Sequence, residues 1–333
     1  MTTPSLILTA SPHLRGTDST PRIMWMVVAS LAPVVAAAIY FFGPSALLVL
    51  LAATGGAVLT ERMVQRNTLR DGSAALTGLL LGLTLPAGFP MWMAFLGGAF
   101  GIGIGKLLFG GLGSNVFNPA LIGRAFLQAT FPVAITTWPA ASADWWALRG
   151  DNLAFPLMSA DPAHTVSAAT PLGAMKFDQQ GTALQDLVLG TTGGSLGETA
   201  GLLILLAGLW LAWRRILDWR IPAAILLTVA VLAHLLTLAD AARHAGAMFH
   251  LFSGGLLFAA VYMATDPVTC PMTPRGRWIF GVGIGALTMV IRTWGGLPEG
   301  VMYAILIMNA LSPAIGRMTQ PRVFGTRHAK AAP

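Results

Sequence analysis

The chain of 333 residues has little charge and almost no cysteine. Asp, Glu, Lys and Arg together make up 10% of its residues, whereas a soluble domain has roughly 25%. The single cysteine, Cys270, excludes an internal disulfide and cannot by itself ligate a metal cluster. A cleavable signal peptide is not expected either, because the first apolar run begins near Ile23 with no small-residue cleavage site behind it.

The chain is instead rich in hydrophobic residues. Hydrophobic residues make up 55% of the sequence and the mean hydropathy is +0.70. The sparse charges separate apolar runs of about 15 to 20 residues, the length that crosses a bilayer core. Ten such runs are predicted to span a membrane, and they cover residues 23–42, 46–60, 73–85, 91–109, 116–131, 199–213, 221–239, 247–265, 278–291 and 300–316.

The basic residues supply the orientation. The net charge of +7 does not indicate nucleic-acid binding, because Lys and Arg stand at the ends of apolar runs and no dense basic stretch is interleaved with aromatic residues. If the N-terminus is cytoplasmic, fifteen Lys and Arg residues fall on the inner side and four on the outer side, with Arg124 inside a span. Cytoplasmic loops carry this excess, so both termini are predicted to be cytoplasmic in a bacterial inner membrane.

Three short blocks recur in the same order. Residues 100–105 (Phe-Gly-Ile-Gly-Ile-Gly) match residues 280–285, a Gly-Gly pair follows each copy, and Asn118–Arg124 resembles Asn309–Arg317. The Gly-rich strings lie within apolar runs with no strand before them, so they indicate close helix packing rather than nucleotide loops. The recurrence predicts an internal duplication. Because each copy holds five spans, the second copy must be inverted relative to the first.

The predicted fold is therefore an all-α polytopic membrane protein with about ten transmembrane helices in two inverted five-helix repeats. The predicted segments are a cytoplasmic N-terminus (1–22), the first repeat (23–131), a periplasmic loop (132–198), the second, inverted repeat (199–316) and a cytoplasmic tail (317–333). A loop as long as 132–198 is uncommon unless it has a function.

Three motifs in this chain resemble the RnfD/NqrB family of membrane subunits. They are Asn115–Arg124, Thr265–Thr269 (Thr-Asp-Pro-Val-Thr) and, in the long loop, Ser167–Leu172 (Ser-Ala-Ala-Thr-Pro-Leu). The resemblance covers nearly the whole chain, and the lack of a long N-terminal extension makes it most like RnfD. Such subunits belong to ion-translocating ferredoxin:NAD and NADH:quinone oxidoreductases.

The resemblance implies a covalent cofactor. In that family a threonine in a Ser-Gly-Ala-Thr type motif carries FMN through a phosphoester bond, and Thr170 holds the matching position beside Ala169. Ser167 is the nearest competing hydroxyl. The chain departs from the family where Ala168 stands in place of Gly and where His164 stands in place of an acidic residue. The implied partners are a flavin transferase and the other Rnf-type subunits (A, B, C, E and G).

Other polar residues leave alternatives open. Asn115, Asn118 and Asp266 stand at the inner ends of spans, where they either cap helices or form a second pocket for non-covalent riboflavin, as the resemblance implies. Arg124 either contacts the tethered phosphate or ring or extends its side chain to the membrane interface, and Arg292 carries a weaker expectation of the same kind. Lys106 is expected to anchor the inner face, and His234, His244 and His250 lack the spacing of metal ligands.

Two functions from different classes remain. The favoured one is a flavin-carrying subunit of a redox-driven ion pump that passes electrons between ferredoxin- and NAD-linked subunits. The alternative is a solute channel or transporter, because inverted helical repeats are a common transporter architecture. The sequence contains neither iron–sulfur ligands nor a nucleotide-binding fingerprint, so we do not expect this subunit to be catalytic alone.

Overall fold

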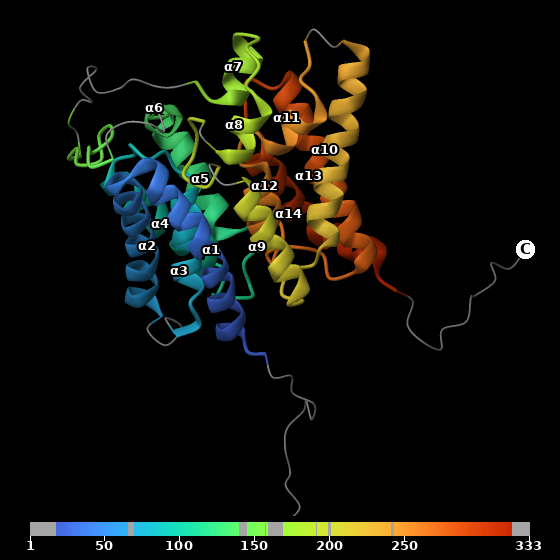
Figure 1. Ribbon diagram of the computed structural model, residues 1–333. Helices are drawn as coiled ribbons and strands as arrows, with labels where there is room; N and C mark the ends of the chain where they lie inside the picture. Colours follow the sequence, from blue (N-terminus) through green and yellow to red (C-terminus); the bar gives the residue numbers. More distant parts are fainter. Residues whose placement is uncertain are drawn as a thin grey trace, which may run out of the picture.

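The computed structural model describes residues 18–65, 70–139, 145–156, 158, 169–190, 192–198, 201–240 and 243–321, and within these ranges every regular element is helical (Figure 1). Four helices are long and apolar enough to cross a membrane: α1 (Thr20–Phe42), α2 (Pro44–Val64), α10 (Arg220–Ala239) and α14 (Val301–Thr319). The all-α class is thus confirmed and the four candidate spans are consistent with a membrane protein, whereas the ten spans and the inverted repeat stay predictions.

Other helices, all but α13 shorter than these four, lie in the remaining predicted spans. They are α3 (Ser73–Leu83), α4 (Met91–Ile102) with its π-helical extension η2 (Gly103–Leu107), α5 (Pro119–Thr130), α9 (Gly201–Trp213) and α13 (Pro274–Trp294). The predicted span 247–265 is divided into α11 (Ala247–Phe252), α12 (Leu256–Phe258) and the π-helix η4 (Ala259–Met263). The division falls at Gly254, whose φ of 67° lies in the left-handed region that glycine tolerates and other residues rarely adopt.

The two halves share a packing order. In the first half α2 packs on α4 and α4 packs on α5; in the second half α10 packs on α13 and α13 packs on α14. Small residues allow the close approaches, since a Cβ added at Gly285 would lie 2.9 Å from the carbonyl oxygen of Ile225 on α10. The expectation that the Gly-rich strings form helix-packing faces is therefore confirmed.

The recurring strings, however, do not occupy equivalent positions. A Cβ at Gly101 would meet Pro119 of α5, whereas a Cβ at the matching Gly281 would meet Ile221 of α10. Asn118 caps the start of α5, whereas Asn309 lies buried inside α14. Similar Gly-rich strings recur in apolar helices wherever two helices pack closely. The packing order of the helices, and not these strings, is what supports a repeat.

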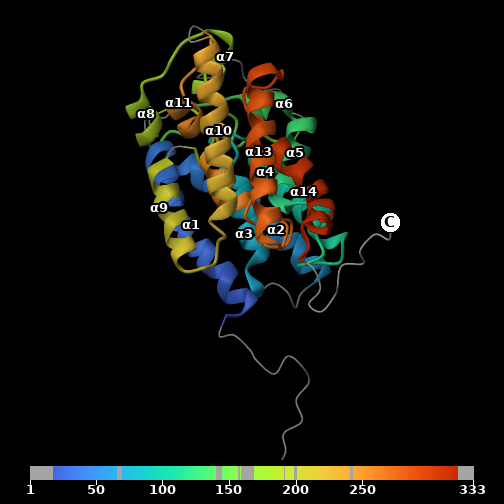
Figure 2. The same ribbon diagram turned by 90° about the vertical axis from the view of Figure 1, so that its right-hand side faces the viewer.

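The described parts of residues 132–198 lie at one end of the bundle. Figures 1 and 2 show α6 (Pro132–Thr136) and α7 (Pro171–Phe177) at the upper end, whereas α1 begins and α14 ends at the lower end. The third short helix of this segment is α8 (Leu184–Leu189). The segment then turns back into the bundle, where the Gly197 N–H donates to the carbonyl of Leu83 at 2.6 Å. The long loop is therefore packed onto both halves.

Candidate functional site

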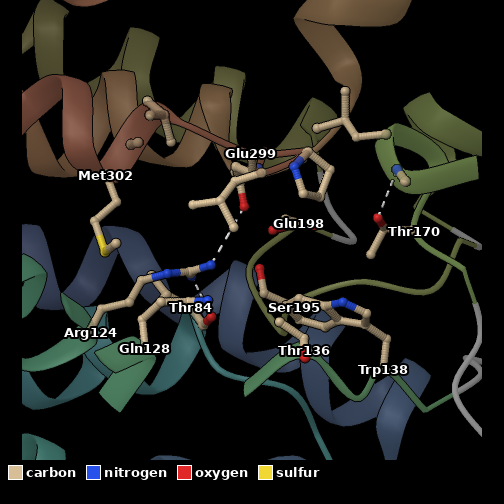
Figure 3. A pocket seen from close by; sticks show the side chains of 18 of the residues that line it. Thr84, Arg124, Gln128, Thr136, Trp138, Thr170, Ser195, Glu198, Glu299 and Met302 are labelled. Carbon is tan, nitrogen blue, oxygen red and sulfur yellow. Dashed lines mark hydrogen bonds and ion pairs between the residues drawn. The ribbon is translucent and has the colours of Figure 1, made fainter. Parts of the chain in front are cut away.

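A cavity of about 380 Å³ opens where the two halves and the long loop meet (Figure 3). Its walls include the end of α3, the middle of α5, α6, the start of α7, the interrupted helix α11–η4, and the segments before α9 and α14. The polar residues that line it include Thr84, Arg124, Thr170, Glu198 and Glu299. The volume falls within the range of about 300 to 1,000 Å³ that small-molecule sites occupy.

Thr170 is held on the wall of this cavity by the start of α7. Its backbone is extended (φ −69°, ψ 150°), and its hydroxyl oxygen accepts a hydrogen bond from the Gly173 N–H at 3.1 Å. Pro171 occupies the first helical position, where its missing N–H costs nothing. This is an ordinary threonine N-cap, which fixes the direction of the Cβ–Oγ bond. Ala169 lines the cavity beside it, and Ser167, Ala168 and His164 lie outside the described residues.

Arg124 lines the cavity and points into it (Figure 3). One guanidinium nitrogen donates to the carbonyl oxygen of Thr84 at 2.5 Å, and the other lies 3.5 Å from a carboxylate oxygen of Glu299. The Arg124 side chain is 12% exposed. The carbonyl that it binds lies just beyond α3, where the backbone has no helical partner. Arg124 therefore connects the end of α3 to the segment before α14 across the cavity.

Two carboxyl groups that sequence reasoning missed face the same space. Glu299 accepts the Gly255 N–H at 2.5 Å, in the break between α11 and α12. Burial raises the pKa of Glu198 to about 7, and the carboxylate of Glu299 acts in the same direction, against the opposing effects of Ser195 and Arg124. Their rarity was the available signal, since the whole chain contains only 13 acidic residues.

Arg292 supports the cavity wall instead of lining it. The side chain is buried on α13, and its guanidinium donates to the carbonyl of His250 at 2.6 Å and to that of Ser253 at 3.0 Å. Both carbonyls belong to the interrupted helix of the second half, where the break leaves backbone acceptors without helical partners. Arg292 thus holds the turn that presents Gly255 to Glu299.

Lys176, also missed from the sequence, fixes α7 to the second half. Its ammonium donates to the carbonyls of Ile291, Arg292, Gly295 and Leu297 at 2.5 to 3.4 Å. These carbonyls end α13, where a cation is favoured by the helix dipole. Burial lowers the pKa of Lys176. Thr170 is therefore only six positions from Lys176, which anchors α7 to the second half.

We expect the change Lys176→Met to release α7 from the end of α13. Hydrogen bonds to a charged group contribute about 1.5 to 3 kcal/mol each, and four acceptors lose their donor together. Proteolysis of the segment 132–198 in intact membranes or detergent should become several-fold faster, while the rest of the bundle stays protected. Lys176→Arg, which keeps the charge, is the matched control. Unchanged protection in the methionine variant would contradict this role.

A second, smaller cavity of about 100 Å³ lies at the end of the bundle where α1 begins. As expected, Asn115, Asn118, Thr265 and Asp266 converge on it. Asn118 caps α5 by accepting the Ala120 N–H at 3.0 Å, and its amide also donates to the carbonyl of Met263 at 3.2 Å. Capping and convergence therefore occur together. The cavity is smaller than the usual small-molecule site, and bound riboflavin stays a prediction.

Lys106, expected as an inner-face anchor, is instead a buried partner of Glu61. The ammonium lies on the π-helix η2, 2.7 Å from the Glu61 carboxylate and 2.5 Å from the Ser73 hydroxyl. The two charged side chains are 1% and 0% exposed. The anchor interpretation was wrong because Glu61 stands 45 residues earlier and reaches Lys106 only through the packing of α2 against η2.

Comparison with known proteins places the chain among membrane oxidoreductase subunits. The model of the NQR2, RnfD, RnfE family matches residues 7–325. The D subunit of a proton-translocating ferredoxin:NAD(+) oxidoreductase complex from Clostridium ljungdahlii is 42% identical over 335 residues, which cover 96% of each chain. The D subunit of an ion-translocating oxidoreductase complex from Stutzerimonas stutzeri is 44% identical, with 95% of each chain covered. A Na(+)-translocating counterpart from Acetobacterium woodii is 38% identical over 98% of this chain and 97% of its own length.

Proposed function

Because this chain belongs to the NQR2, RnfD, RnfE family, we propose that it is a membrane subunit of an ion-translocating oxidoreductase complex and that it carries FMN on Thr170. Its part in the complex is to pass electrons between ferredoxin- and NAD-linked subunits while a cation crosses the membrane. The observation that carries the proposal is the position of the Thr170 hydroxyl on the wall of the 380 Å³ cavity between the two halves.

The residues of the cavity fit this cofactor. Apolar side chains, among them Leu121, Phe258 and Met302, offer a surface for a flat aromatic ring. The Arg124 guanidinium supplies positive charge for a phosphate. Esterification leaves the threonine oxygen with a lone pair, so the hydrogen bond from the Gly173 N–H is compatible with attachment. Bound there, a flavin exchanges electrons singly or in pairs, and the protein supplies its position and tuning.

We place the covalent cofactor on the outer side of the inner membrane. The fifteen-to-four distribution of Lys and Arg and the opposite positions of α7 and the ends of α1 and α14 support ten spans in two inverted repeats, with both termini cytoplasmic (Figure 1). A reporter enzyme that is active only in the cytoplasm should be active when it is fused after Pro333. A fusion that is active only in the periplasm would contradict this topology.

The protein requires partners. Its single cysteine cannot hold an iron–sulfur cluster, so electrons must enter and leave through other chains. The relatives are all named as one lettered member of a complex, which supports assembly with Rnf-type subunits (A, B, C, E and G). A flavin transferase on the outer side is proposed to install the phosphoester. A purified single chain that transferred electrons from ferredoxin to NAD would refute this division of labour.

Intact mass spectrometry of the subunit from its native membrane tests the covalent cofactor most directly. We expect a mass increase equal to FMN less one water, located by peptide mapping to the segment that contains Thr170, and ultraviolet fluorescence of the denatured band on a gel. An unmodified mass and a dark band in protein from the native source would instead favour the transporter function.

A further inference from the structure

The outer cavity contains more negative charge than a site for an anionic cofactor needs. Glu198 and Glu299 both line it, and the carboxylate of Glu299 raises the pKa of Glu198. Two neighbouring carboxyl groups in a recessed site cannot both ionise cheaply, so one of them tends to keep its proton. Binding a phosphate and an aromatic ring does not require such a group. Its presence calls for a different explanation.

The surroundings of the two carboxyl groups are unequal. Glu299 accepts the Gly255 N–H at 2.5 Å and lies 3.5 Å from the Arg124 guanidinium. Glu198 has Ser195 as its close hydrogen-bonding neighbour and is buried. Pairs of acids in unequal environments divide into a fixed anion and a proton carrier.

The charged groups that face Glu198 come from each surrounding element. Glu299 precedes α14 and repels a negative charge on Glu198, whereas Arg124 on α5 attracts it. Arg292 on α13 interacts electrostatically with both carboxyl groups, although its own donors are directed to backbone carbonyls. Asp178, which follows α7, lines the far side of the same cavity. None of these interactions fixes Glu198 as an ion pair.

We infer that Glu198 is the proton-exchange group for the redox centre of the outer cavity, giving up its proton when an electron arrives there and recovering it afterwards. This rests on the proposed function, since it takes the redox centre to be the flavin on Thr170. It assigns to one residue of this chain the link between electron transfer and proton movement on the outer side.

Atoms and electrons balance in this step. A one-electron carrier in a neighbouring subunit is oxidised and the ring is reduced by that electron. The O–H bond of the Glu198 carboxyl breaks, and an N–H bond forms on the ring. The Glu198 carboxylate stays ionised while the ring is reduced. When the electron passes onward, the N–H bond breaks, its proton is released to water at the mouth of the cavity, and Glu198 takes up a proton from that water.

Infrared difference spectroscopy on the intact complex tests the assignment. Spectra recorded between oxidised and reduced flavin should show a change in the C=O stretch of a protonated carboxyl group. Glu198→Gln should remove that band, and Glu198→Asp should keep it at a shifted frequency. The control Asp151→Asn, on the outer side but away from this cavity, should leave the band unchanged. Gel fluorescence of each variant confirms that flavin attachment is intact.

The rate of flavin reduction gives a second measurement. In the wild type it should be constant below about pH 7 and fall roughly tenfold per pH unit above it, because Glu198 is protonated below its raised pKa of about 7 and ionised above. In Glu198→Gln it should be at least tenfold slower at pH 6 and nearly independent of pH. A fluorescent glutamine variant that keeps the wild-type band and pH profile would overturn the inference. If the denatured wild-type subunit does not fluoresce on the gel, the proposed function itself is contradicted.

Discussion

Thr170→Ala should abolish the gel fluorescence of the denatured subunit and the ion-coupled turnover of the complex. Only a hydroxyl can form the phosphoester, and Thr170 is the described hydroxyl on the cavity wall within the motif Ser167–Leu172. The change also removes the N-cap of α7, which costs about 1 kcal/mol, a small part of the stability of a chain this size. The variant should therefore insert and assemble. The checks are in-gel fluorescence, intact mass and the yield of assembled complex.

Another threonine in the chain provides a matched control. Thr273 caps α13 with the same local pattern, a threonine followed by proline, one residue and glycine, and its hydroxyl accepts the Gly276 N–H at 3.1 Å. The corresponding distance at Thr170 is also 3.1 Å. Thr273→Ala should lose a comparable cap and keep full fluorescence. Loss of fluorescence in both variants would indicate that unfolding, not a missing attachment site, explains the first result.

Two further variants locate the bond. Thr170→Ser keeps a hydroxyl in the same place and should retain partial labelling, whereas Ser167→Ala should be labelled like the wild type. If Thr170→Ala still fluoresces and the added mass maps to Ser167 or another residue, the site assignment is wrong, although the function could stand.

The second large effect is expected at the buried pair of Lys106 and Glu61. Lys106→Met leaves the Glu61 carboxylate buried without its cation, and breaking a buried ion pair from one side costs about 3 to 5 kcal/mol. The melting temperature of the purified subunit in detergent should fall by several degrees, and less protein should remain monodisperse. Glu61→Gln should also destabilise, through loss of the charge that holds the Lys106 ammonium.

The double variant separates a pair interaction from general damage. Lys106→Met combined with Glu61→Gln removes both charges, so it should be more stable than Lys106→Met alone. A double-mutant cycle reports the coupling directly. If the two single changes are additive and the double variant is the least stable of the three, the ion pair contributes nothing and the contact is incidental.

The sequence by itself indicated an apolar, membrane-like environment, the presence of helices and the local helix caps. An apolar chain with few charges must satisfy its backbone within helices, and helices occur in each predicted segment among the described residues. The caps at Asn118, Thr170 and Thr273 also follow from sequence, because each hydrogen bond joins residues two or three positions apart and the following proline starts the helix. The family resemblance, drawn from three motifs, is confirmed by the family match.

Only the tertiary structure decided which residues share a cavity. Arg124 and Glu299 are 175 residues apart, and Lys106 and Glu61 are 45 apart. The repeated strings predicted equivalent contacts, but Gly101 faces α5 and the matching Gly281 faces α10, because a glycine does not specify which neighbouring helix it contacts. Local hydrogen bonds depend on residues within one turn and can be predicted from their order. The pairing of buried charges depends on how distant helices pack, and local sequence does not encode it.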